Sequence, residues 1–131
     1  MAGNKLETTP IHLGLGARAH VEPAFTGMAW YADYGARHVA DGAEGRLVSM
    51  HTFSESWTGW EMHPACDGVV LCTAGEMVLH QQARDGTVTT VRIGAGEYAI
   101  NPPGVWHTAD IVGEATVVFI TAGMGTENRA R

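Results

Sequence analysis

The stretch at positions 96–107 reads Gly-Glu-Tyr-Ala-Ile-Asn-Pro-Pro-Gly-Val-Trp-His. Tyr98–Asn101 predicts a short strand, because aromatic and β-branched residues favour extended backbone. The sequence Pro102-Pro103-Gly104 predicts a sharp turn, since proline fixes its own φ and glycine tolerates conformations that other residues avoid. A second strand then runs from Val105 to Ala109 and carries His107 near its start. This stretch indicates a fold built from short strands joined by tight turns.

The same pattern continues on both sides of this stretch. Asp85-Gly86 is a hairpin signal, because it supplies the positive φ that tight two-residue turns need. Strands spaced by about ten residues, without helices of 10–15 residues between them, predict a sandwich or barrel rather than βαβ units. The predicted strands are Leu47–Phe53, Trp57–His63, Val69–Thr73, Glu76–Gln82, Val88–Ile93, Tyr98–Asn101, Val105–Ala109 and Ala115–Ala122.

The first 45 residues follow a different pattern. Aromatic residues at near-helical spacing predict a short helix within Met28–Val39. Gly14-Leu15-Gly16 resembles the start of a nucleotide-binding loop, but no strand and helix complete that motif, so we interpret it as a turn. The chain is thus predicted to be one all-β domain over 1–131. It comprises an irregular or short-helical segment at 1–45, a strand-rich core at 46–122 and a tail at 123–131.

Composition excludes several classes of function. The 131 residues are 45% hydrophobic and 17% charged, with a net charge of −6. No cluster of Lys and Arg is present for binding the nucleic-acid backbone. No apolar run approaches the length of a membrane span. The polar first ten residues do not resemble a signal peptide, and two cysteines are too few for a disulfide scaffold, so we expect a cytoplasmic protein.

Three residues form the main candidate site. Glu61 and His63 lie two positions apart in a predicted strand, so their side chains share one face. His107 would add a second imidazole from a distant strand. One carboxylate and two imidazoles form a facial triad that binds divalent transition metals and leaves coordination positions open.

The spacing Gly96, Pro102, Gly104, His107 matches the second motif of the cupin superfamily as far as the histidine. In the first cupin motif, Glu61 takes the place of the first histidine and His63 that of the second. Over 46–122 the sequence therefore resembles a small cupin. The resemblance implies a double-stranded β-helix, or jelly-roll barrel, with the motif residues facing its mouth. It also implies a divalent metal there (Fe, Mn, Zn or Ni).

The chain departs from the cupin motifs at two places. The usual glutamate position holds Gly68 when counted back from Gly75, whereas Asp67 fits the shorter spacing from His63. Asp67 is therefore predicted as a further metal ligand. The asparagine that often follows the second motif is replaced by Ile111, with Asp110 beside it.

Further residues are predicted to line the pocket. Trp57 shares the face of Glu61 and His63 by period two, whereas Trp60 should point away from it. Cys66 is a candidate soft ligand, but buried thiols are more often inert. The predicted pocket-lining residues are His51, Trp57, Trp106 and Asp110.

Two functions remain open from the sequence. In the first, a metal-dependent oxygenase or isomerase acts on a small polar molecule in the barrel mouth. In the second, a metal-free cupin binds or senses a small ligand, and Glu61 and His63 are simply an acid–imidazole pair. A homodimer is expected, with Ile11–Phe25 as the strand that covers an open sheet edge in a second copy.

Overall fold

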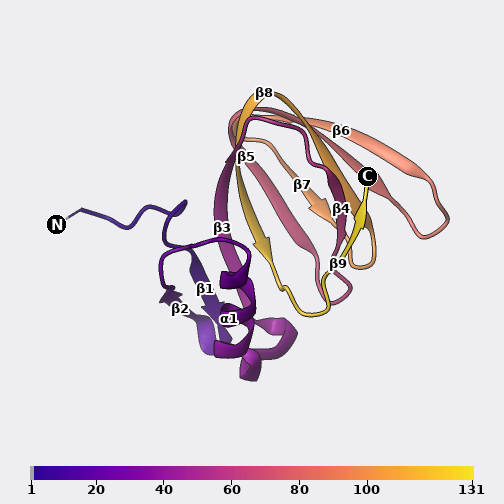
Figure 1. Cartoon of the computed structure of the whole chain (residues 1–131). Coiled ribbons are helices and arrows are strands. Elements are labelled where there is room, and N and C mark those ends of the chain that lie inside the picture. Colours follow the sequence, from indigo (N-terminus) through magenta and orange to yellow (C-terminus); the bar gives the residue numbers. More distant parts are fainter. Residues whose placement is uncertain (1) are drawn as a thin grey trace.

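The computed structural model describes residues 2–131, which form one bent antiparallel sheet (Figure 1). The first two strands of the sheet and the helix that follows them form an N-terminal layer at one end of it. The sheet has nine strands in the order β2-β1-β3-β8-β4-β9, with β5 pairing β6, β7 and β8. It is not closed, because β2 and β9 each pair along one edge only. Within residues 2–131, no helix is long and apolar enough to cross a membrane.

The N-terminal layer begins with a hairpin. Strands β1 (Ile11–Gly14) and β2 (Arg18–Val21) are joined by the 3-10 turn η1 (Leu15–Ala17), which confirms the turn predicted at Gly14-Leu15-Gly16. Strand β1 pairs with β3 of its own chain. The segment expected to pair with a second copy therefore pairs internally, and β2, exposed along its whole length, is the edge that remains. The homodimer stays a prediction.

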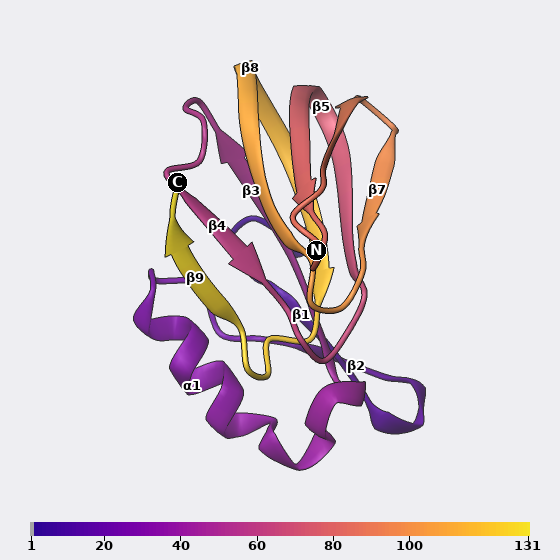
Figure 2. The same cartoon turned by 90° about the vertical axis from the view of Figure 1, so that its right-hand side faces the viewer.

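Helix α1 (Ala29–Arg37) follows, and the 3-10 segment η2 (Val39–Glu44) leads into the sheet. The sequence predicted this helix within Met28–Val39, and it is about a turn shorter. Trp30 anchors it: the indole is 4% exposed, and its Nε1 donates a hydrogen bond to the Pro23 carbonyl at 3.0 Å. In the view of Figure 2, α1 lies below β4 and β9.

The remaining strands occur close to their predicted positions. The Asp85-Gly86 hairpin joins β5 to β6, and Gly86 has a φ of 87°. The stretch predicted as a tail contains a strand that pairs with β4. The bounds are β3 Arg46–Phe53, β4 Gly59–Met62, β5 Gly68–Gln82, β6 Val88–Gly94, β7 Tyr98–Asn101, β8 Trp106–Thr121 and β9 Glu127–Ala130.

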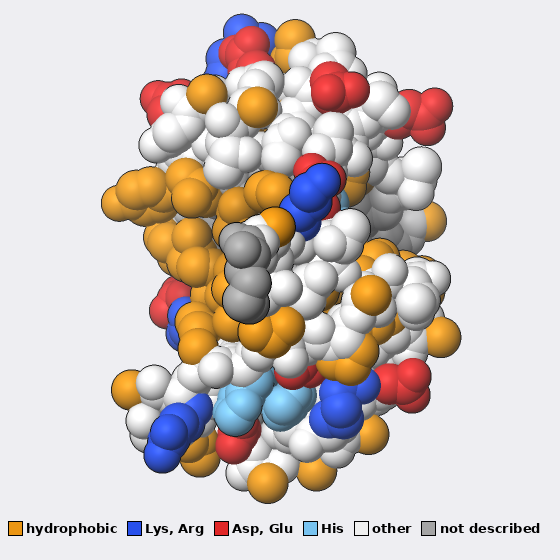
Figure 3. All heavy atoms as spheres, turned by 90° about the vertical axis from the view of Figure 1, so that its left-hand side faces the viewer, with side chains coloured by type: hydrophobic (Ala, Val, Ile, Leu, Met, Phe, Trp, Pro, Cys, Tyr) orange, Lys and Arg blue, Asp and Glu red, His pale blue; other side chains and the backbone are white. Residues whose placement is uncertain are grey.

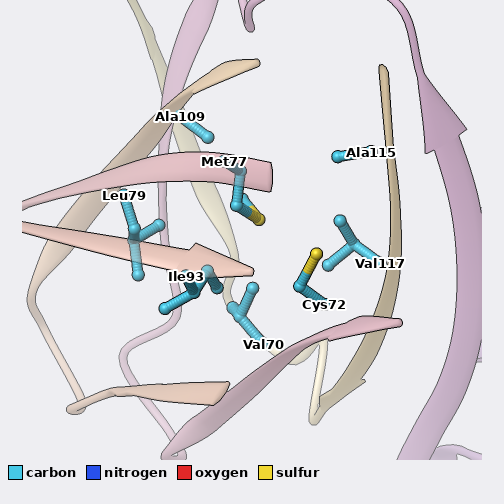
Figure 4. Packing of buried hydrophobic residues seen from close by; sticks show 8 residues of the cluster. All are labelled: Val70, Cys72, Met77, Leu79, Ile93, Ala109, Ala115 and Val117. Atoms are coloured by element: carbon cyan, nitrogen blue, oxygen red, sulfur yellow. The ribbon is translucent and has the colours of Figure 1, made fainter. Parts of the chain in front are cut away.

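The apolar core lies between the two halves of the bent sheet. Alternate residues of β5 and β8 point inward, as period two requires. Met77, Leu79 and Val117 are completely buried. Figure 4 shows the core side chains from several strands pointing into one space: Val70, Cys72, Met77, Leu79, Ile93, Ala109, Ala115 and Val117.

Strands β5 and β8 bend at the same place. The sequence predicted a break in each, but both continue through it as one strand with a bulge. Gly75 pairs with Ala115 and Glu76 pairs with Val112, so two residues of β8 are left out of the ladder. A bulge of this kind bends a strand and increases its twist. The bend lets the first half of β8 pair with β4 and its second half with β3.

We predict that Gly75→Ala destabilises the fold by about 2 kcal/mol or more, because Gly75 has a φ of 76° and an added Cβ would overlap the carbonyl oxygen of Glu114. Gly86→Ala is the matched control. Its φ of 87° is similar, but its added Cβ would meet nothing within 4 Å, so we expect a loss of only about 1 kcal/mol. Denaturant unfolding measures both, and equal losses would contradict the role given to the bend.

Candidate metal centre

Three of the four predicted ligands, Glu61, His63 and His107, come together where β4 meets β8. Glu61 pairs directly with His107 across the ladder, and His63 follows two positions later on the same face. One ligand atom from each of the three residues lies within 4.8 Å of the other two. His63 Nε2 is 3.3 Å from Glu61 Oε1, and the rings of His63 and His107 are 5.3 Å apart between centroids.

A hydrogen-bond chain fixes the tautomer of His63. The Thr126 hydroxyl donates to the Gly123 carbonyl at 2.9 Å, so it can only accept from His63, whose Nδ1 lies 2.9 Å away. His63 therefore carries its proton on Nδ1 when it is neutral. Its Nε2 lone pair then faces the carboxylate of Glu61, an arrangement that is unfavourable unless a cation or a proton lies between them.

Burial controls the charge of the site. His107 is 3% exposed, and its Nδ1 has no hydrogen-bond partner among the described residues. Burial, followed by the effect of nearby His63, lowers the pKa of His107 to about 4. Burial also lowers the pKa of His63 and raises that of Glu61. Both imidazoles are thus neutral at neutral pH, which is the state that a metal ligand requires.

The group fits a divalent metal ion. Two neutral imidazoles and a carboxylate are the ligand types of first-row transition metals. The hydroxyl on Nδ1 of His63 is the outer partner that metal-binding histidines usually have. Glu61, His63 and His107 would hold the ion.

A cavity of about 1210 Å³ opens over this group and extends beneath α1. Tyr31 reaches across it from α1, with its hydroxyl 3.4 Å from His51 Nε2. Trp57 packs edge-on to His107, at 6.3 Å between ring centroids. Aromatic side chains form much of the wall: Phe25, Tyr31, Tyr34, Phe53, Trp57, Trp60 and Phe119.

The pocket-lining predictions meet different outcomes. His51 and Trp57 line the cavity, whereas Trp106 and Asp110 do not. Trp106 lies under the guanidinium of Arg129, and Asp110 pairs with His80 at 2.7 Å. The reason is strand parity. Trp106 and Asp110 lie one and three positions from His107, so their side chains point to the opposite face.

The group of three candidate ligands does not include Asp67, Cys66 or Trp60. Asp67 is exposed and does not belong to the group of three, so its role as a ligand stays a prediction. Cys66 is buried, with its sulfur against the Ala122 backbone. Strand parity predicted that Trp60 points away from the pocket. Trp60 nevertheless lines the cavity, because the cavity continues past β4 to Arg129.

Sequence reasoning missed the contributions of Thr126 and of the N-terminal layer. Thr126 lies 63 residues from His63. It follows Gly123-Met124-Gly125, and no local pattern connects it with the site. The near-helical spacing of Tyr31 and Tyr34 predicts a helix, but it does not show what the helix covers.

Comparison with known proteins supports the fold. No protein-family model matches the sequence, and no curated protein matches it. Among solved structures, oxalate oxidase matches with a TM-score of 0.58 at 20% identity, over 70% of this chain and 50% of that one. Oxalate decarboxylase of Bacillus subtilis, which has Mn(II) centres, matches at 0.56 and 14% identity, over 73% of this chain and 26% of that one. The chain has a cupin fold.

A third cupin-like match is hydroquinone 1,2-dioxygenase from Sphingomonas sp. TTNP3 with bound 4-hydroxybenzoate. Its TM-score is 0.50 at 13% identity, over 58% of each chain. The chain spans about half the length of the oxalate oxidase and about a quarter of the length of the oxalate decarboxylase. At these identities the likeness establishes the cupin fold and leaves the activity to be argued from the site.

We predict that the metal-stripped protein loses stability as the pH falls from about 6.5 to about 4. His107 takes up a proton near 6.5 when unfolded but only near 4 when folded, so stability is complete above this window and is lost through it. The loss from this residue is up to about 3 kcal/mol. Urea unfolding at successive pH values measures it.

His107→Asn is the comparison for this prediction. It should show a shallower fall in stability over the same window. The fall should not vanish, because the pKa values of His51 and His63 are also lowered. An identical pH profile for the variant would contradict the assignment to His107.

Proposed function

We propose that this cupin binds a divalent metal ion through Glu61, His63 and His107 and acts on a small polar molecule in the cavity above it. The observation that carries the proposal is the Nε2 lone pair of His63, which the Thr126 hydrogen bond directs toward the Glu61 carboxylate. A cation between the two resolves their repulsion and gains a neutral imidazole from His107. The Mn(II) centres of the decarboxylase, a neighbour in fold, support the same assignment.

The residues at the site would have different roles. Glu61 supplies negative charge, and the two imidazoles supply neutral donors on one side, so that the cavity side stays free for a ligand. The aromatic wall excludes water from the ligand, which strengthens polar interactions inside. When bound, the metal supplies a Lewis acid for ligand oxygens or a binding position for dioxygen. An oxygenase or an isomerase would use these features.

A second candidate function is metal-free binding of a small ligand. The separation of 3.3 Å between His63 and Glu61 favours it, because a shared proton would also remove their repulsion. Metal content separates the two candidates. The identity of the metal (Fe, Mn, Zn or Ni) and a cytoplasmic location stay predictions.

We predict that protein purified without chelators contains about one equivalent of a transition metal, and that His63→Ala and His107→Ala each abolish the loading. The matched control is His80→Ala, since His80 is a strand histidine that bonds to Asp110 and Thr90 outside the cavity. Elemental analysis gives the metal content, and thermal unfolding with and without added metal gives the stabilisation.

Two results would decide against parts of this proposal, and a third decides the role of Asp67. Less than about a tenth of an equivalent of metal, with no stabilisation by added metal, favours metal-free binding, because a ligand of the native state must raise its stability. Full loading in both histidine variants would show that the ion binds elsewhere. Unchanged loading in Asp67→Asn would exclude Asp67 as a ligand.

We predict that Thr126→Val weakens metal binding by about tenfold to a hundredfold, because the His63 ring loses the partner that fixes its tautomer and orientation. Thr73→Val is the control, since the Thr73 hydroxyl donates to the Thr116 carbonyl away from the site. Competition with a chromophoric chelator measures both affinities. Equal affinities would contradict the role given to Thr126.

A further inference from the structure

A second cluster of titratable side chains lies in the N-terminal layer. His12 on β1 is 1% exposed, and both of its ring nitrogens are hydrogen-bonded. Its Nε2 is 2.6 Å from Asp41 Oδ2 on η2, and its Nδ1 is 2.6 Å from the Tyr34 hydroxyl on α1. Three separate elements therefore meet in one linear chain of hydrogen bonds.

Counting protons fixes the direction of this chain. An ionised Asp41 can only accept, so His12 donates from Nε2. When the ring is neutral, it has a lone pair on Nδ1, which accepts from the Tyr34 hydroxyl. Burial, followed by the charges of Glu22 and Asp41, raises the pKa of Tyr34, so the hydroxyl keeps its proton. Asp41, His12 and Tyr34 are arranged as a carboxylate, a base and a hydroxyl, the order of a catalytic triad.

Two glycines hold the backbone tightly over the Asp41–His12 pair. A Cβ at Gly45 would lie 2.9 Å from both the Asp41 Cβ and the His12 Cε1. A Cβ at Gly14 would lie 3.1 Å from Asp41 Oδ2. The main chain thus packs closely against the pair, and His12 is the buried member while Asp41 keeps 25% of its side chain exposed.

Two members of this hydrogen-bond chain line the large cavity. His12 and Tyr34 line the same cavity as Glu61, His63 and His107. Tyr31, one turn earlier on α1, lies near enough to Glu61 that the carboxylate adds to burial in raising the pKa of Tyr31. Residues three apart on a helix are about 5–6 Å apart at Cβ. A ligand that fills this cavity would therefore contact both the metal group and the face of α1 that carries Tyr31 and Tyr34.

We propose that Asp41, His12 and Tyr34 form a proton relay that deprotonates a weakly acidic hydroxyl, such as that of a phenol or an enol, on a ligand bound in the cavity. The ligand O–H bond breaks as its proton passes to Tyr34 Oη. The Tyr34 proton passes to His12 Nδ1 at the same time, so Tyr34 remains neutral throughout. The products are a ligand oxyanion and an imidazolium ion that Asp41 stabilises.

The neighbouring charged groups form a second, separate network. His38 stacks on His12 at 3.6 Å between ring centroids, and its Nε2 bonds to Glu22 at 2.8 Å. Glu22 is 5% exposed and also accepts from Arg37 at 3.1 Å. His20 lies 5.9 Å from His12. Figure 3, which looks at the molecule from its N-terminal side, shows histidines gathered between acidic and basic side chains.

This second network joins Glu22, the residue after β2, to the C-terminal end of α1 through an ion pair, whereas the first includes Tyr34, which lines the cavity. The two networks are equally buried at their centres, since Glu22 is 5% and His12 1% exposed. The Glu22 network therefore provides an internal control for a purely structural role.

The test uses 4-nitrophenol, whose absorbance separates the phenol from the phenolate, with the full chain stripped of metal by a chelator. Stripping makes the result independent of the proposed metal function. We expect the ionisation equilibrium of the bound probe to shift toward phenolate by about tenfold, which equals about one pKa unit. Tyr34→Phe, which keeps the ring, should remove the shift, and Asp41→Asn should remove most of it.

Glu22→Gln should keep most of the shift, because the Glu22 carboxylate makes no hydrogen bond to the relay. His80→Ala should keep all of it, because His80 bonds to Asp110 and Thr90 outside the cavity. Circular dichroism confirms that each variant is folded. Absence of binding, binding without a shift, or a shift that persists in folded Tyr34→Phe would overturn the proposal. A shift lost equally in folded Glu22→Gln would assign both networks a fastening role and would overturn it as well.

Discussion

The register between β4 and β8 is the constraint on which the candidate site depends. It sets Glu61 directly opposite His107, and period two then brings His63 to the same face. A slip of one residue would turn His107 away and bring Trp106 or Thr108 inward. The register is in turn fixed by the bend, because the bulge opposite Gly75 lets one half of β8 pair with β4 while the other half stays with β3.

Electrostatics at the site follow from that geometry. Imidazoles in the low-dielectric interior give up their protons, and a buried carboxylate is costly unless something neutralises it. The Thr126 hydroxyl removes the remaining freedom by settling which nitrogen of His63 carries hydrogen. The three candidate ligands thus form an acceptor-rich group with one negative charge at most, and aromatic side chains from α1 and from the sheet line the cavity above it. Either a bound metal ion or a shared proton would remove the repulsion between His63 Nε2 and the Glu61 carboxylate.

Much of this followed from the sequence, because it depends on local rules. Strand parity brought Glu61 and His63 together, and the spacing around Pro102 and Gly104 marked the strand of His107. The same parity rule places Asp110 on the outer face. Its prediction as a pocket residue came instead from its position beside Ile111, which replaces the asparagine of the cupin motif. Other features were out of reach because they depend on tertiary contacts. Nothing local to Thr126 indicates His63, and nothing local to His12 indicates that Asp41 and Tyr34 lie on either side of its ring.

The position of Thr126, between β8 and β9, affects the order in which the candidate metal site can form. His63 and its threonine partner are separated by 63 positions. A ribosome would therefore have released both motif histidines before the residue that sets the tautomer of the first of them emerged. Contacts so distant along a chain are slow to form, since the intervening loop must lose its freedom before the contact repays it. In a nascent chain, the ligand set would exist as three unoriented side chains until the end of the sheet had closed against β4.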